Sequence, residues 1–127
     1  MDLYIDQSPN SCINPYYLNL SSKDKENWPI VIAHELGHKK MGHFEGTIEN
    51  RIIAHINPIV KLRQELEAWG WAIKKNPSIT SKQIEPYIET YLTGVREISG
   101  EKKYQECLDM YEVWFNKTFG DRDETLL

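Results

Sequence analysis

The sequence lacks the features that mark several large classes of protein. It has two cysteines in 127 residues, Cys12 and Cys107, too few for a four-cysteine zinc site or a disulfide framework. Its longest apolar run covers residues 29–33, far short of the ~18 residues that a membrane-spanning helix needs. Residues 1–6 are acidic and show neither the basic nor the apolar part of a secretion signal. We therefore expect a cytoplasmic protein with free thiols and no membrane segment.

The sequence also has fewer positively than negatively charged residues. Fifteen lysines and arginines stand against nineteen aspartates and glutamates, which gives a formal net charge of −4 at pH 7. Because general nucleic-acid binding depends on positive charge near phosphates, this balance argues against a nucleic-acid partner. The hydrophobic share of 40% and the charged share of 27% are typical of a folded globular domain. At this length we expect a single domain over residues 1–127.

The expected fold is α+β, with a small sheet first and helices after it. Residues 3–5 and 16–20 are β-prone and are separated by turn-forming residues, which predicts a hairpin or small sheet. Apolar residues at three-to-four spacing predict four to five helices after this sheet. Their expected bounds are about Trp28–Met41 with Gly42 as the stop, Thr47–Ile56, Asn57–Asn76 with Asn57 as the cap, a segment around Tyr87–Ile98 ending at Gly100, and Tyr104–Phe119 ending at Gly120. Residues 1–77 carry the motifs described next, and residues 78–127 form a helical extension with a frayed tail.

A metal-binding motif lies on the first predicted helix, where His34, Glu35 and His38 form the pattern H-E-x-x-H. At ~100° per residue, the two histidines stand about 40° apart around the helix and one turn apart along it. Both imidazoles can therefore reach one metal ion. Glu35 points about 100° away from His34, so it lies beside the ion, where a base can take a proton from metal-bound water.

An open catalytic zinc site needs a third protein ligand. His43 does not fit the pattern with a third histidine, because that pattern needs Gly and His where this chain has Met41 and Phe44. We expect His43 at the rim of the site, or behind a ligand. The helix predicted from Asn57 offers better candidates in its two carboxylates.

These carboxylates belong to Glu65 and Glu67. Glu65 shares one helix face with Ala68, Trp69 and Ala72, and the small alanines would let this helix approach the histidine helix closely. A glutamate 27 residues beyond His38, in a Glu-x-x-Ala frame, suits a zinc site built from two helices.

The two motifs together resemble those of the zincin metallopeptidases of the gluzincin branch. HELGHKKMGH at residues 34–43 and ELEAWGWA at residues 65–72 are most similar to the HELGHxxxxH and ExEAxxFA patterns of the ImmA/IrrE-like soluble peptidases. They are also similar to the minigluzincins and to the catalytic core of the CAAX-prenyl-protease-like peptidases. The resemblance covers about residues 14–75. It implies a zincin-like fold, with a small sheet over the active-site helix and a second helix that supplies a glutamate ligand.

The resemblance also implies roles for individual residues. His34 and His38 become ligands of one zinc ion per chain, and Glu35 becomes the general base. Glu65 becomes the third ligand, because the family's ligand stands three residues before the alanine, with Glu67 as the alternative. In the CAAX-protease-type and thermolysin-type patterns, an aspartate four residues beyond the ligand glutamate supports a zinc-bound histidine, whereas this chain has Trp69. Support for that histidine must then come from elsewhere.

The implied activity is zinc-dependent hydrolysis of a protein substrate inside the cell, such as a transcriptional repressor or another regulator. If residues 16–20 form an exposed sheet edge, an extended peptide could add to it as a strand. The C-terminal helix or tail could lie over the cleft and keep the enzyme latent. An oxyanion also needs a donor, for which the sequence offers His55, Arg63, Tyr87, Tyr91, Tyr104 and Tyr111.

Two other functions stay open on the sequence alone. The first is a zincin-fold module that binds a partner protein without cleaving it; Trp69 favours this reading, whereas Glu35 counts against it because a structural zinc ion needs no base. The second is a structural helical domain with a chance H-E-x-x-H. Bound metal would exclude the chance motif, and loss of hydrolysis on Glu35→Gln would exclude the binding module. Two histidines and a carboxylate also suit divalent ions other than zinc.

Overall fold

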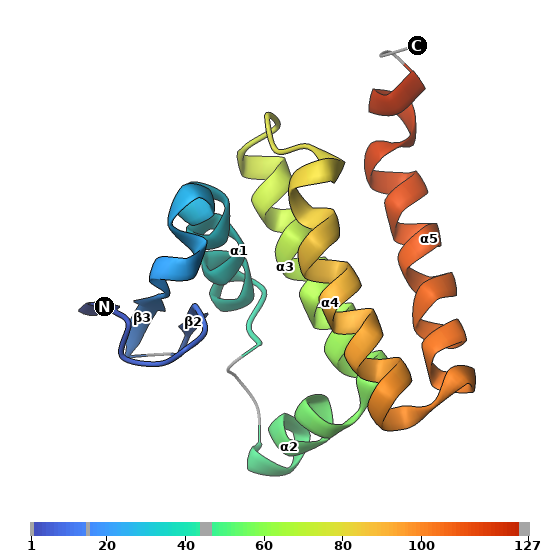
Figure 1. Cartoon of the computed structure of the whole chain (residues 1–127), viewed down its shortest axis with the longest axis horizontal. Helices are drawn as coiled ribbons and strands as arrows, with labels where there is room; N and C mark the ends of the chain where they lie inside the picture. Colours follow the sequence, from blue (N-terminus) through green and yellow to red (C-terminus); the bar gives the residue numbers. More distant parts are fainter. Residues whose placement is uncertain (1, 15, 44–46, 125–127) are drawn as a thin grey trace.

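A small sheet and five helices follow one another along the described chain. The computed structural model describes residues 2–14, 16–43 and 47–124, and this part has the α+β composition expected from the sequence. Figure 1 shows the strands beside α1, then α3, with α4 and α5 on the far side of α3. The elements are β1 (Asp2–Ile5), β2 (Cys12–Ile13), β3 (Tyr17–Leu20), the 3-10 helix η1 (Ser22–Asn27), α1 (Trp28–Lys40), α2 (Ile48–Ile56), α3 (Pro58–Lys75), α4 (Ser81–Ser99) and α5 (Glu101–Glu124).

The sheet has the strand order β1-β3-β2, in which β1 is parallel and β2 antiparallel to β3. A hairpin between the first and second β-prone runs is therefore wrong, although the small sheet is present. The buried Asn19 side chain of β3 donates to the carbonyl oxygens of Ser8 and Asn10 and accepts from the Gln7 N–H. These bonds fix the segment that leads from β1 to the opposite edge of the sheet, where β2 forms before the chain returns as β3.

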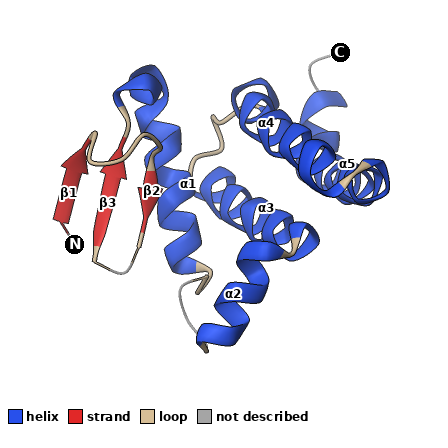
Figure 2. Ribbon diagram, turned by 60° about the horizontal axis from the view of Figure 1, so that its bottom comes forward, coloured by secondary structure: helices blue, strands red, loops and turns tan. Residues whose placement is uncertain are grey.

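Because β3 is central, residues 16–20 are not the exposed sheet edge that the sequence suggested for substrate binding. Leu18 and Leu20 of β3 are buried and cluster with Ile13 and Val31. The edge next to α1 is β2, as Figure 2 shows. Any strand that adds to this side of the sheet must therefore pair with β2.

The helices α1, α2 and α3 begin and end within one residue of their predicted bounds. Gly42 follows α1 with a φ of 74°, a left-handed conformation that favours glycine after a helix. Asn57 caps α3, because its side chain accepts hydrogen bonds from the backbone N–H groups of Ile59 and Val60. Local capping chemistry therefore sets these boundaries.

The last helix is longer than expected. The prediction that it ends at Gly120 is wrong, because α5 continues to Glu124. Phe119 is buried, with its ring centroid 5.2 Å from that of Phe115 and 5.9 Å from that of Trp114. Phe119 also belongs to the core that α5 shares with α1, α3 and α4, which favours helix on both sides of Gly120, and one glycine in a helix costs only about 1 kcal/mol relative to alanine.

The main core joins α1, α3, α4 and α5, so the helical extension shares its core with the motif-bearing helices. A smaller cluster packs the sheet on α1. Within the described residues, no helix is long and apolar enough to cross a membrane. The buried residues of the main core are Ile30, Ala33, Leu62, Leu66, Trp69, Ala72, Ile73, Ile79, Ile84, Ile88, Leu92, Val95, Cys107 and Phe119.

α1 approaches α3 closely at Gly37, which lies between His34 and His38 in the chain. A Cβ atom added at Gly37 would lie 2.4 Å from the carbonyl oxygen of Ala68 and 3.0 Å from its Cα. Ala68 and Ala72, on the face of α3 that contacts α1, are fully buried. The small residues thus allow the close packing of the two helices that the sequence predicts, and a larger residue at position 37 would force them apart.

We predict that Gly37→Ala lowers the free energy of unfolding by about 1–3 kcal/mol, because the new methyl group overlaps backbone atoms that cannot move independently. Urea denaturation followed by circular dichroism measures this change. Gly94→Ala is the matched control, since it also lies inside a helix but has nothing within 4 Å of the added Cβ. The control should stabilise the protein by about 0.5–1 kcal/mol; equal stability of both variants would contradict the close contact.

Candidate metal centre and its surroundings

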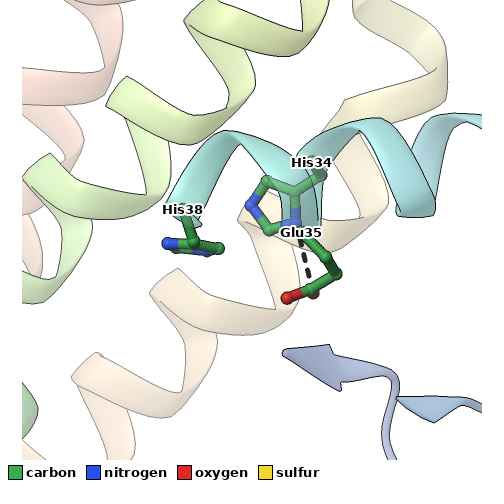
Figure 3. Close-up of side chains that lie close together, drawn as sticks. All are labelled: His34, Glu35 and His38. Atoms are coloured by element: carbon green, nitrogen blue, oxygen red, sulfur yellow. Dashed lines mark ion pairs between the residues drawn. The ribbon is translucent and has the colours of Figure 1, made fainter. Parts of the chain in front are cut away.

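His34, Glu35 and His38 lie together on one side of α1 (Figure 3). The two imidazole rings meet edge to face, with their centroids 4.7 Å apart. One potential ligand atom from each of the three residues lies within 4.8 Å of the other two. His34 and Glu35 are also buried. The three side chains are therefore close enough to share one metal ion.

Glu65 on α3 reaches both histidines. Its Oε2 lies 2.9 Å from His34 Nε2, and its Oε1 lies 3.1 Å from His38 Nε2. Glu67, the alternative carboxylate, contacts a different ring, with its Oε1 3.4 Å from His43 Nε2. The fold therefore brings Glu65, and not Glu67, into contact with the histidine pair of the motif.

Electrostatics favour a cation between Glu65 and the two rings. Burial lowers the pKa of His34, but the carboxylates of Glu35 and Glu65 outweigh burial and raise this pKa to about 9. Burial raises the pKa of Glu65, but His34 and His38 outweigh burial and hold this pKa well below its usual range. The two opposite shifts have one cause, the attraction between the Glu65 carboxylate and a positive charge at the rings.

The donor set fits a zinc ion. Two imidazole nitrogens and one carboxylate oxygen form many catalytic zinc sites, in which a fourth position stays open for water or substrate. His34 Nε2 is buried and lies 2.9 Å from Glu65 Oε2, in an ion pair that does not have the geometry of a hydrogen bond. A metal ion shared with His38 and Glu65 would give this nitrogen a well-directed partner.

Trp69 supports His34 by stacking. The indole lies nearly parallel to the imidazole, with an interplanar angle of 15° and centroids 4.1 Å apart. Trp69 is itself buried, and its ring centroid lies 5.7 Å from that of Tyr87. The residue that replaces the expected aspartate therefore fixes the plane of the His34 ring through its aromatic face. The sequence showed the replacement but not this stacking, which depends on how α3 packs on α1.

His43 lies behind His38. The Nδ1 atoms of the two rings are 2.8 Å apart, a hydrogen bond in which one nitrogen donates and the other accepts. Because the Nε2 atom of His38 faces Glu65, its Nδ1 atom is the one left for His43. The position next to a potential ligand agrees with one of the two places that we expected for His43, and Glu67 lies on the far side of its ring.

Glu35 borders two hollows in the surface. The larger is an open groove of about 750 Å³, and the smaller has about 340 Å³. Glu35 and Glu65 line both, so the candidate metal centre lies between them. The groove is also lined by Ser11, Cys12, Ile13, His38, His43, Ile48, Arg51, Ile52, Lys61 and Gln64.

The outer wall of this groove is formed by α2, and the sequence alone did not connect this helix with the site. Ile48, Arg51 and Ile52 belong to this wall. The available signal was the spacing of Ile48, Ile52 and Ile56 at intervals of four residues, which places them along one helix face. That spacing indicates an apolar face, but it does not tell which other element the face approaches.

Among the oxyanion donors suggested by the sequence, Tyr87 lines the smaller hollow together with His34, Glu35 and Glu65. The hydroxyl of Tyr91 donates instead to the Pro58 carbonyl oxygen. The side chain of His55 lies outside the described residues. Arg63 is exposed, Tyr104 lies under the Arg96 guanidinium and Tyr111 packs among the aromatic residues of α5.

The described part of α5 borders neither hollow at the site. Its buried residues Cys107 and Phe119 belong to the main core. The predicted cover over the cleft therefore does not come from this helix, and residues 125–127 of the tail lie outside the described residues.

Comparisons of the chain with protein-family models, with curated proteins and with solved structures give no match.

We predict that the purified protein binds about one zinc ion per chain, and that His38→Ala and Glu65→Ala abolish this binding because each removes a direct ligand. Inductively coupled plasma mass spectrometry of the dialysed protein measures the metal content. Glu67→Ala is the matched control, because Glu67 lies on the same helix but forms its ion pair with His43. Retention of zinc by Glu65→Ala together with its loss in Glu67→Ala would contradict the assignment.

We also predict that His43→Leu weakens zinc binding about 10–100-fold, because it removes the group that orients His38. Competition with a chromogenic chelator measures the affinity. His43→Asn keeps a polar atom near the position of Nδ1 and should recover part of the loss. Equal affinities of the wild type and His43→Leu would show that the hydrogen bond between the two rings does not position His38.

Proposed function

We propose that this protein is a zinc-dependent metallopeptidase that hydrolyses peptide bonds of a protein substrate. The observation that carries the proposal is the position of the Glu65 carboxylate, within 3.1 Å of the Nε2 atoms of both motif histidines. The zincin-like identity of the fold is part of the same proposal. It rests on the resemblance of the two motifs and on the order of a small sheet, a histidine helix and a glutamate helix.

The two carboxylates of the site support different roles. Glu65 faces the Nε2 atoms of His34 and His38, whereas Glu35 approaches the other nitrogen of His34, with its Oε1 3.5 Å from Nδ1. Glu65 is therefore the better ligand, and Glu35 does not have to bind the ion directly. A carboxylate beside the ligand set, at the wall of an open groove, suits a general base.

In the proposed reaction, His34, His38 and Glu65 would hold a zinc ion, whose positive charge would polarise the scissile carbonyl and lower the pKa of a water molecule to ~7. Glu35 accepts the proton of the attacking water and later donates it to the leaving amine nitrogen. Trp69 and His43 keep the two imidazoles in their orientations. Tyr87 is the best-placed candidate to donate a hydrogen bond to the oxyanion.

The groove suggests how a substrate binds. Ser11, Cys12 and Ile13 line it, and the last two form β2, an edge strand of the sheet. An extended peptide in the groove can pair its backbone with the free edge of β2, which would position a peptide bond beside the metal centre. The resemblance to the ImmA/IrrE-like peptidases suggests an intracellular regulator, such as a transcriptional repressor, as the substrate.

A second function is a module of the same fold that binds its partner without cleaving it. The observation in its favour is Trp69, which supports His34 by stacking and offers no hydrogen-bonding carboxylate in the place of the family's aspartate. A buried glutamate next to the ligand set has no purpose in such a module. The effect of replacing Glu35 therefore separates the two functions.

We predict that Glu35→Gln keeps its zinc ion but lowers the rate of hydrolysis about 10²–10⁴-fold, because the amide cannot accept the proton. Mass spectrometry of an unfolded protein substrate, incubated with the zinc-loaded enzyme, detects the new peptide ends. Glu26→Gln is the matched control, since Glu26 is exposed on η1 and lines neither hollow. Cleavage by Glu35→Gln at the wild-type rate would exclude Glu35 as the base, and no cleavage by the zinc-loaded wild type would favour the binding module.

A further inference from the structure

The helix α2 presents an uncovered apolar surface next to the candidate site. Figure 1 shows it projecting from the body of the molecule, below α1 and α3. Its four isoleucines are exposed by 49–73% of their surface, although exposed isoleucines are usually scattered singly on a protein surface. The four residues are Ile48, Ile52, Ile53 and Ile56. A cluster of this kind is characteristic of a binding surface.

Two positive charges stand among these apolar residues. Arg51 on α2 and Lys61 on α3 line the groove together with Ile48 and Ile52. The one described acidic residue of α2, Glu49, does not line it. The groove therefore has two sides of different character, with the carboxylates of the metal centre on one side and an apolar, positively charged wall on the other.

Neither of these cations forms an ion pair within the described residues. Lys61 stands four residues before Glu65, a spacing at which lysine and glutamate on a helix usually attract each other. Here the Glu65 carboxylate is directed at His34 and His38, which leaves Lys61 without its ordinary partner. The positive charge of the wall is therefore available to a ligand in the groove.

The same surface continues beyond the groove. A neighbouring hollow of about 560 Å³ is lined by Lys61 and Ile56, and by apolar groups of α4 that include Ile98. Ile98 is 88% exposed. Lys61 thus stands where the two hollows meet, and apolar side chains flank it in both. A ligand that extends from the metal centre past α2 would meet apolar surface and positive charge in turn.

We infer that this groove binds an extended peptide segment in which large apolar side chains alternate with acidic ones. The apolar side chains pack on Ile48 and Ile52, and the acidic side chains pair with Arg51 and Lys61. This inference rests on the proposed peptidase function and names its substrate class. A nucleic acid would meet only two cations here, opposite the carboxylates of Glu35 and Glu65, so an acidic peptide fits the charges better.

The test measures peptide binding by fluorescence anisotropy, with the full chain carrying Glu35→Gln to prevent cleavage. The first probe is a fluorescein-labelled peptide of alternating leucine and glutamate separated by serine. In the second probe lysine replaces glutamate, and in the third serine replaces leucine. We expect the first probe to bind about tenfold more tightly than either of the others, because both the charge and the apolar contacts contribute.

Reversing the charges of Arg51 and Lys61 tests the contribution of charge most directly. Arg51→Glu combined with Lys61→Glu should weaken binding of the glutamate probe about tenfold and make the lysine probe the tighter of the two. Lys82→Glu combined with Lys102→Glu is the matched control, because both lysines are exposed on other helices and line no hollow at the site. It should leave the order of the probes unchanged.

A second variant tests the apolar part without changing charge. Ile48→Ser combined with Ile52→Ser should reduce the advantage of the leucine probe over the serine probe, and circular dichroism checks that each variant is folded. Equal binding of all three probes by the parent chain, or an unchanged order in the charge-reversal variant, would overturn the inference. Zinc content and cleavage by the wild type are measured separately, so a chain that selects the probes but cleaves nothing would contradict the peptidase function and leave the groove assignment intact.

Discussion

The candidate site depends on how closely α1 can approach α3. Gly37 has no side chain at the point where the Ala68 carbonyl oxygen meets α1, and the two alanines of α3 are fully buried there. A glutamate side chain is short, so its carboxylate can contact two imidazoles on another helix only when the backbones are near one another. The distances of 2.9 and 3.1 Å from Glu65 to the two Nε2 atoms are therefore a consequence of residues that take no part in the chemistry.

The two imidazoles are oriented by different physical means. His34 stacks on the buried indole of Trp69, whereas His38 forms a hydrogen bond with the ring of His43. Stacking fixes the plane of a ring, and a hydrogen bond fixes which of its nitrogens is left for another partner. Both supporting groups are neutral or weakly basic, so the negative charge next to the ring nitrogens comes from Glu35 and Glu65. These two carboxylates outweigh the effect of burial on the pKa of His34.

Local patterns in the sequence predicted much of this arrangement, and non-local packing determined the rest. The turn-to-turn spacing of His34 and His38 and the cap at Asn57 are properties of short segments, and the bounds of α1 and α3 follow from them. The strand order could not be read in this way, because it depends on hydrogen bonds of Asn19 to a loop about ten residues earlier. The end of α5 was missed for a similar reason, since Phe119 packs in a core that distant helices share. The sequence favoured Glu65 over Glu67 only through the family resemblance. The contact of Glu65 with both histidines depends on the rotation of α3 about its axis, which its packing against α1 defines.

One rigid element, α3, connects the candidate metal centre with the surface that we infer to bind the substrate. Lys61 and Glu65 are one turn apart on α3, so their Cβ atoms are separated by only about 5–6 Å. The helix is fixed along its length by buried residues from Leu62 to Ile73, so the backbone positions of Lys61 and Glu65 cannot shift independently. A peptide carboxylate that pairs with Lys61, as we infer, would therefore lie near the candidate ligand Glu65. Such placement converts the binding of a peptide into correct positioning of its scissile bond. The residues next to that bond, and not only the overall affinity of the peptide for the protein, should therefore decide which bond is cleaved.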